Sequence, residues 1–270
     1  MPHTRAPSLP SARALAVLLP VLLVAGGARS LAGQVGALER DERSPAETIA
    51  SDRPGIGNGS WVLAPGVFQV EAGASRFDAG ASTLYRLGEL LLRYGVGGLE
   101  LRGGLNSFAL RRNGADADGL EDLSVGVKTR IGTSSDDVMT VSALVESSLP
   151  TGSDAFTADE ALLTLALLAD WDFEGGAGLS VNGGYTSAFE TLADETWTVT
   201  VTPTYSFASV EGLGIYGGWA GTFPPGQSVH VIEGGLAWLP GADTQLDLNG
   251  GWDPESGDFF VGLGIARRWR

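Results

Sequence analysis

The sequence predicts an all-β protein: a single transmembrane, antiparallel, up-and-down β-barrel of about twelve strands. Three observations predict this fold. Glycine makes up 40 of the 270 residues and lysine occurs once, which favours many short strands over helices. Apolar and polar residues alternate along one segment after another beyond residue 65. Charged residues fall on the face opposite the apolar rows, where a hydrated lumen accepts them and a dry core does not.

Composition excludes several classes of function. Acidic residues outnumber basic ones 32 to 17, and the net charge of −15 argues against a nucleic-acid partner, because phosphate binding needs positive charge. The chain has no cysteine and two histidines, so thiolate catalysis, cysteine-ligated zinc and iron–sulfur clusters are excluded. We therefore predict no cofactor, no metal site and no nucleic-acid partner.

The beginning of the chain has the order of a secretory signal. Arg5 and Arg13 precede an apolar run over residues 14–25, and small residues follow. A transmembrane helix is the alternative, but Pro20 interrupts the run, which is shorter than the roughly 20 residues that a membrane-spanning helix needs. We predict, in order, a signal peptide, a periplasmic N-terminal segment and an outer-membrane β-barrel: residues 1–32, 33–65 and 66–270.

The clearest alternation runs from Trp197 to Phe207. Apolar and aromatic side chains there interleave with threonine and serine. In a soluble sandwich the apolar face would form the core, whereas in an outer-membrane barrel it would face lipid. Alternation alone therefore leaves both folds open.

The number and length of the segments favour the barrel. Most exceed the roughly five or six residues of soluble strands and match the roughly 9–11 or more that cross a bilayer obliquely. An even number also leaves both chain ends on one side of the membrane. The predicted strands cover residues 66–78, 82–94, 99–110, 119–131, 138–149, 159–172, 177–188, 196–207, 214–223, 228–238, 244–253 and 258–270.

The face opposite the apolar rows defines a charged lumen. The candidates for a lumen lining or constriction are Glu71, Glu89, Arg93, Glu100, Arg102, Lys128, Arg130 and Glu146. Three further residues are predicted on the same, inward face of their strands: Asp170, Glu233 and Asp247. If Tyr94 pairs with Leu99 across the hairpin at Gly95–Gly98, Arg93 lies opposite Glu100 and Arg102 lies diagonally from Glu89. Such ion pairs either neutralise one another or form a solute-selecting constriction, and both interpretations stay open.

Several short motifs then resemble a known family. In order they are Ser51-Asp52-Arg53-Pro54-Gly55, Pro65 to Gly73, Leu92 to Val96, Leu99 to Arg102, Gly119 to Lys128, and Leu149-Pro150-Thr151-Gly152. Together they resemble the outer-membrane, transporter-like β-barrel family labelled putative meta-pathway of phenol degradation, over Ser51 to the C-terminus. Glu121 stands where a second glycine is expected in the fifth motif.

The resemblance implies a barrel channel for small molecules, sometimes hydrophobic or aromatic compounds. It also implies that the N-terminal motif, Asp52, Arg53 and Pro54, together with the rest of the segment before Gly66, tucks into the periplasmic mouth. The alternative is that residues 33–65 form a flexible tail.

Enzymatic function is the main rival class, since some outer-membrane barrels hydrolyse lipid with serine and histidine on the outer wall. His230 is the candidate base, but no serine motif accompanies it, so an interfacial histidine is the simpler interpretation. The pattern Gly212 to Gly217 fits a dinucleotide fingerprint in letters but lacks the required strand and helix. The acidic loop over residues 113–122 lacks the spacing of a calcium loop.

The sequence thus predicts a non-enzymatic channel of the bacterial outer membrane that passes small solutes. The expected partners are outer-membrane lipid and lipopolysaccharide, the barrel-assembly machinery and the solutes. A non-conducting structural barrel, an outer-membrane lipid hydrolase and a secreted soluble β protein remain the alternatives.

Overall fold

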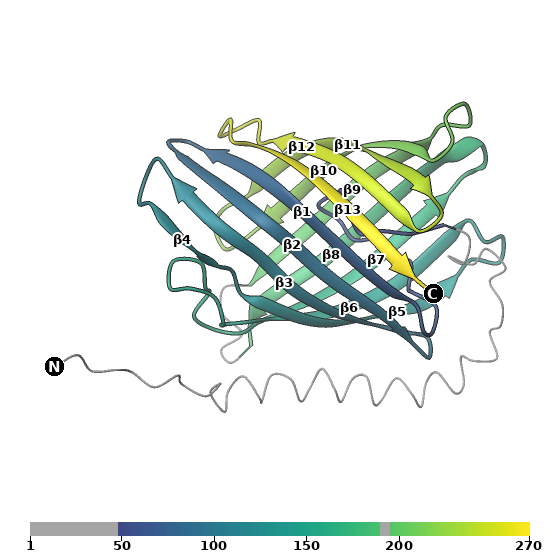
Figure 1. The fold of residues 1–270 in the computed structure, drawn as a ribbon, viewed down its shortest axis with the longest axis horizontal. Helices are drawn as coiled ribbons and strands as arrows, with labels where there is room; N and C mark the ends of the chain where they lie inside the picture. The colour runs from purple at the N-terminus through teal and green to yellow at the C-terminus, as the bar shows by residue number, and fades with distance from the viewer. Residues whose placement is uncertain (1–47, 190–194) are drawn as a thin grey trace.

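The computed structural model describes residues 48–189 and 195–270, which form a closed β-barrel (Figure 1). The predicted signal peptide, residues 1–32, lies outside the described residues, as do residues 33–47 of the predicted periplasmic segment. The strands are β1 (Phe68–Ala79), β2 (Ser82–Val96), β3 (Leu99–Arg112), β4 (Ala117–Leu120), β5 (Leu123–Thr133), β6 (Met139–Leu149), β7 (Leu162–Asp172), β8 (Ala177–Ala188), β9 (Thr196–Ser206), β10 (Leu213–Phe223), β11 (Val229–Gly241), β12 (Thr244–Trp252) and β13 (Phe259–Trp269).

Antiparallel pairing runs around the whole ring. Neighbouring strands pair in chain order, β1 pairs with β13, and β3 pairs with both β2 and β5, so the barrel has no free edge. Twelve strands make the ring, and the short β4 continues the path of β5 along β3. The predicted twelve-stranded barrel is confirmed.

The strand predicted over 119–131 is divided into β4 and β5 at Asp122. The Asp122 carboxylate accepts N–H bonds from three residues that follow β6: Thr151 at 2.9 Å, Gly152 at 2.7 Å and Ala158 at 2.9 Å. These bonds fasten the connection between β6 and β7 to the wall. Because they hold Asp122 in that role, the ladder between β3 and its neighbour is interrupted there.

Helical structure is minor in the described parts of the chain. It consists there of one 3-10 turn, η1 (Glu174–Gly176). No helix among those residues is long and apolar enough to span a membrane.

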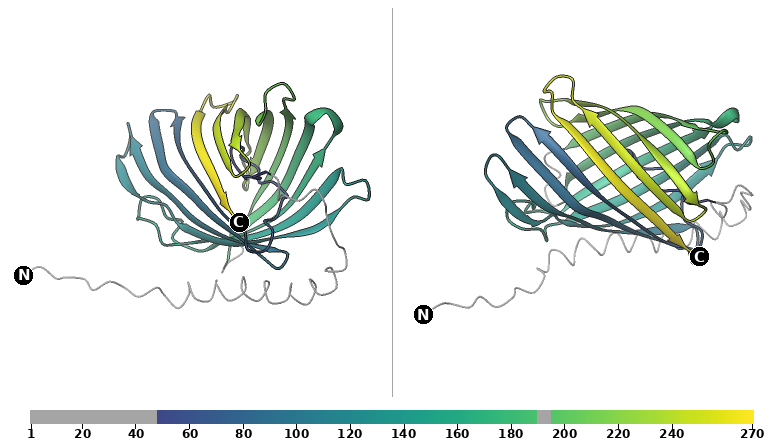
Figure 2. Two further views of the ribbon diagram at one scale, coloured as in Figure 1. Left: turned by 45° about the vertical axis from the view of Figure 1, so that its right-hand side comes forward. Right: turned by 45° about the horizontal axis from the view of Figure 1, so that its top comes forward.

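The two faces of the wall differ as the alternation predicts. Large apolar side chains such as Leu167, Trp197 and Leu263 are 59%, 56% and 60% exposed on the outside. Glu71 and Lys128 on the inside are fully buried. The tilted strands enclose this polar interior (Figure 2). An apolar exterior around a charged interior is the arrangement of a barrel in lipid.

The hairpin of β2 and β3 corrects the predicted register. Tyr94 pairs with Leu101, two residues beyond the predicted partner, so Arg93 lies opposite Arg102 and not opposite Glu100. The turn explains the shift: β2 continues to Val96, and the link shrinks to two glycines with positive φ, which the tight hairpin turn requires. A shift of two keeps every side chain on its face, so the predicted lumen face is unchanged.

The connections define two ends of the barrel. The end that carries the short links β2–β3 and β11–β12 and the C-terminus is called the turn end below. The opposite end carries the longer connections, including residues 150–161, and is called the loop end.

Candidate functional site

Residues 48–65, called the lumen segment below, lie inside the barrel. The segment has no strand or helix, so its backbone N–H groups need acceptors from the wall. Leu63 N–H donates to the Glu100 carboxylate on β3 at 3.1 Å, and Ile56 N–H donates to Glu233 on β11 at 3.1 Å. These acceptors stand on distant strands of the ring. The segment therefore crosses the lumen and is held from several sides.

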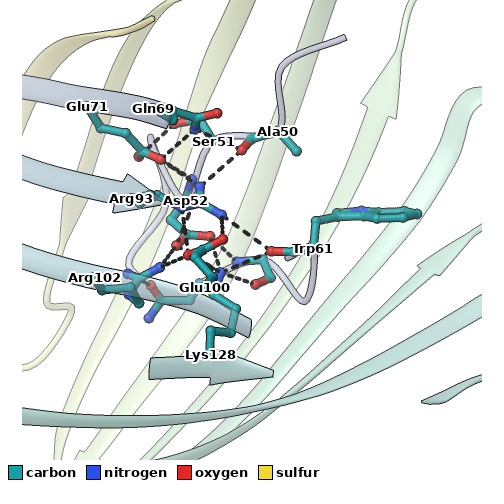
Figure 3. Close-up of polar contacts among 12 residues, drawn as sticks. Ala50, Ser51, Asp52, Trp61, Gln69, Glu71, Arg93, Glu100, Arg102 and Lys128 are labelled. Atoms are coloured by element: carbon teal, nitrogen blue, oxygen red, sulfur yellow. Dashed lines mark hydrogen bonds and ion pairs between the residues drawn. The ribbon is translucent and has the colours of Figure 1, made fainter. Parts of the chain in front are cut away.

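The centre of these contacts is a group of six charged side chains that we call the Asp52 cage (Figure 3). Both Asp52 carboxylate oxygens lie 3.0 Å from Lys128 Nζ, and Oδ2 accepts a hydrogen bond from Arg102. Arg93 Nη1 lies 3.7 Å from the same oxygen. The other two members are the wall carboxylates Glu71 and Glu100. The six residues of the cage are thus Asp52, Glu71, Arg93, Glu100, Arg102 and Lys128. Three positive and three negative side chains thus balance.

Asp52 is held in its charged form. Burial raises the pKa of its carboxyl, but the fields of Arg93, Lys128 and Arg102 outweigh burial and lower the pKa far below its ordinary value. Asp52 therefore remains an anion at any physiological pH. An uncharged residue in its place would leave three buried cations facing two carboxylates.

Arg93, on β2, links the two carboxylates of the cage that stand on the wall. Its guanidinium contacts Glu71 at 2.7 Å and Glu100 at 2.8 Å, and its side chain is 1% exposed. Glu71 also accepts a hydrogen bond from Ser51 Oγ at 2.8 Å. The predicted Arg93–Glu100 ion pair forms although the two residues are not cross-strand partners, because both side chains point into the lumen.

Arg53 makes a second, smaller anchor. Its guanidinium contacts Glu89 at 3.1 Å and Asp247 at 3.3 Å, two carboxylates on β2 and β12. Glu89 thus pairs with Arg53, and the predicted contact with Arg102 is wrong because the register has moved. The Pro54 carbonyl, which follows a cis Arg53–Pro54 peptide, accepts a hydrogen bond from Asn249 at 2.7 Å.

Two wall glycines make room for Arg53. Gly73 on β1 and Gly264 on β13 are cross-strand partners. A Cβ built on Gly73 would lie 2.5 Å from Arg53 Cζ, and one on Gly264 would lie 2.6 Å from the same atom. Any side chain at either position would displace the guanidinium.

The remaining candidates, Arg130 and Glu146, lie outside the Asp52 cage. The Arg130 guanidinium stands over the Trp61 ring, 5.8 Å from its centroid. The Glu146 carboxylate is 31% exposed, and its nearest cation is Arg102 Nε at 3.7 Å. Their predicted role in a constriction stays a prediction.

Two cavities adjoin the lumen segment. One, of about 340 Å³, is lined by strands β2, β3, β5 and β6 toward the loop end and is called the outer cavity. The other, of about 270 Å³, is lined by β7 to β11 toward the turn end and is called the inner cavity. Asn58 is the residue that lines both. Its side-chain oxygen accepts a hydrogen bond from Arg102 at 3.1 Å, and its N–H donates to Asn182 at 2.6 Å.

This arrangement suits passage and selection more than bond chemistry. The cations and carboxylates of the cage are paired with each other, so none is poised to act on a substrate. The segment narrows the lumen, and polar groups line most of the outer cavity, whereas the inner cavity has polar and apolar lining residues.

Sequence reasoning missed several residues that fasten the segment. Asn58, Ser60 and Leu63 were assigned no role, although their N–H groups find wall acceptors. Asp170 and Asn182 accept two of those bonds, and the sign of this in the sequence is that both lie on the inward face of their strands. Which donor each would meet depends on the three-dimensional path of the segment.

One family model matches this chain. It carries the description "Putative MetA-pathway of phenol degradation" and matches residues 51–269, so it includes most of the lumen segment. No curated protein sequence matches the chain.

Solved structures share the fold at low sequence identity. An outer membrane channel from Pseudomonas putida F1 is 17% identical with a TM-score of 0.61, over 80% of this chain and 99% of that one. The KdgM porin in complex with disordered oligogalacturonate is 10% identical with a TM-score of 0.54, over 75% and 99%. The NanC porin is 11% identical with a TM-score of 0.52, over 73% and 98%.

Proposed function

Because this chain belongs to the family described as "Putative MetA-pathway of phenol degradation", we propose that it is an outer-membrane channel that passes small solutes. The observation that carries the proposal is the pair of cavities on either side of the lumen segment, which share Asn58 as a lining residue. In this proposal a solute passes through both cavities, from the loop end past Asn58 to the turn end. The route is narrow, which restricts it to small molecules.

The lining of the outer cavity favours polar solutes. Nine of its lining residues are polar or charged, and the other three are Leu90, Leu91 and Gly104. The inner cavity is more mixed, with Trp61, Leu179 and Ile215 among its lining residues. Aromatic or hydrophobic cargo, which the family resemblance implies, finds more apolar surface in this second part of the route.

A non-conducting structural barrel is the second candidate. The Asp52 cage favours it, because its buried ion pairs hold a segment across the lumen and breaking one such pair costs about 3–5 kcal/mol. The two candidates differ in whether water and solutes reach Asn58 from both cavities.

The deciding experiment is planar-bilayer recording of the purified full-length protein, with liposome swelling in charged, neutral and aromatic solutes. The channel proposal expects small, steady current steps and swelling that falls steeply with solute size. Correctly folded protein that gives neither current nor swelling would identify the structural barrel instead.

We assign the protein no enzymatic role. The histidine considered as a catalytic base, His230, packs in an aromatic cluster: its ring stacks on Trp219 with centroids 5.8 Å apart and meets Phe223 edge-on at 5.8 Å. These contacts support the interpretation as an interfacial residue. A lipase assay on the purified protein tests it, and hydrolysis that disappears on His230→Ala would contradict the assignment.

The proposed partners follow from the outer surface. Exposed apolar rows such as Leu263 and Ile265 suit outer-membrane lipid, and lipopolysaccharide would meet the loop end. The closing strand β13, with Phe259 and Trp269 exposed, is the segment that we expect the barrel-assembly machinery to recognise.

A further inference from the structure

We propose that the outer cavity is a binding site for a small, hydroxyl-bearing neutral solute, which is held between Arg102 and Glu146. This inference deepens the proposed channel function and rests on it, because it names the class of solute that the first part of the route selects. Arg102 of the Asp52 cage and Asn58 of the lumen segment both line this site.

The first observation is an unsatisfied donor. Arg102 uses Nη1 for Asp52 and Glu100 and Nη2 for Asn58, yet its Nε–H has no hydrogen-bond partner among the described residues. The side chain is only 3% exposed. A buried guanidinium donor without an acceptor costs free energy unless a bound molecule supplies one.

The second observation is an acceptor that stands across from that donor. Glu146 Oε2 lies 3.7 Å from Arg102 Nε, which is too long for a direct hydrogen bond. Glu146 and Arg102 both line the outer cavity. The two side chains thus border the same space, and because Nε itself is buried, a ligand group reaches it by entering between the two side chains.

Chemistry then selects the ligand group. A hydroxyl oxygen accepts from the Nε–H and donates its own proton to the carboxylate, so it satisfies both partners. An ammonium group has only donors and would oppose the Nε–H. A carboxylate has only acceptors and would oppose Glu146, with Glu89 and Glu121 also lining the cavity.

The rest of the lining suits additional hydroxyl groups. Asn58, Asn106, Ser107 and Ser124 contribute amide and hydroxyl groups, which both donate and accept hydrogen bonds. The volume of about 340 Å³ admits a molecule the size of a short polyol. Asn58 ends the cavity at the segment, so a bound solute would sit directly above the passage to the inner cavity.

Equilibrium dialysis of radiolabelled erythritol against the full-length protein in detergent tests the site. We expect saturable binding that Glu146→Ala weakens about tenfold or more, since one hydrogen bond to a charged group is lost. Asp154→Ala, at an exposed carboxylate of the connection between β6 and β7, is the matched control and should bind as the wild type does. Heat-modifiable gel mobility establishes that each variant is folded.

Competition identifies the class. Butylammonium and butyrate, which offer one charge each, should fail to displace erythritol. Absence of saturable erythritol binding to the wild type, unchanged binding in Glu146→Ala, or stronger displacement by the zwitterion β-alanine would each overturn the inference. Dialysis needs no ion current, so a protein that binds erythritol but never conducts would refute the channel and keep the site.

Discussion

At the residue scale, the two glycines under Arg53 give the most localised prediction. Gly264→Ala adds a methyl group where the Arg53 guanidinium lies and should push it away from Glu89 and Asp247. The Asp247 side chain is fully buried, so its charge would be left uncompensated at a cost of about 3 kcal/mol. The variant should unfold at a lower temperature, as followed by heat-modifiable mobility.

Gly103→Ala provides the control for that experiment. Gly103 is also a strand glycine, but a Cβ added there meets nothing within 4 Å. It should unfold at the wild-type temperature. If both variants lose the same stability, the effect is a general one of glycine in strands and Arg53 is not anchored as described.

Asp52 gives the predicted response to pH. Its folded pKa lies below its unfolded value, near 3.9, so its contribution to anchoring is complete above about pH 4 and is lost as the pH falls further. Single-channel conductance should therefore be constant from pH 8 to pH 5, because Asp52 keeps its charge in the folded protein throughout this range. Asp52→Asn, which removes that charge, should raise the conductance at pH 7. A variant with the wild-type conductance at pH 7 would mean that the cage does not hold the segment.

At the scale of the element, the β2–β3 hairpin depends on its turn. Gly97 and Gly98 have φ of +55° and +89°, a conformation that costs other residues about 1 kcal/mol or more each. The double variant Gly97→Ala, Gly98→Ala should therefore fold more slowly into liposomes, with Gly132→Ala, an unhindered glycine with ordinary φ, as control. Equal folding rates for the two would show that the turn does not set the register.

The strands were predictable from sequence because alternation and turn residues act locally. All twelve barrel strands lie within a few residues of their predicted ranges, and the inward charges Glu71 and Lys128 are where parity puts them. The register of β2 with β3 could not be predicted from the sequence, because it depends on whether Gly95 or Gly97 begins the turn. The break in the strand at Asp122 could not be predicted either, since the three N–H groups that donate to Asp122 lie about 30 residues away in the chain.

The path of the lumen segment was beyond sequence reasoning. The residues of the Asp52 cage were named individually, but Asp52 meets Lys128 across 76 positions of the chain and Arg53 meets Asp247 across 194. Parity predicts that a side chain points inward and says nothing about which inward groups face each other across a barrel. Charge balance within the lumen was the available signal, and it leaves many pairings equivalent.

At the scale of the whole molecule, we propose that the lumen segment narrows the pore that the barrel wall encloses. The wall is closed by strand pairing that does not involve residues 48–63. Those residues contribute Asn58, which lines both cavities, and Asp52 and Arg53, which line the inner one. In this proposal the wall supplies the pore and most of the outer cavity, and the segment narrows the pore.

The most direct test is the single-channel conductance of the full-length protein compared with a variant that lacks residues 48–63. The deletion leaves every barrel strand intact, and a wetted lumen tolerates the uncovered charges of β2, β3 and β5. We predict small current steps for the full-length protein and steps several-fold larger for the deletion variant, with heat-modifiable gel mobility showing that both proteins are folded. Equal conductance in the two, or none in either, would contradict the account.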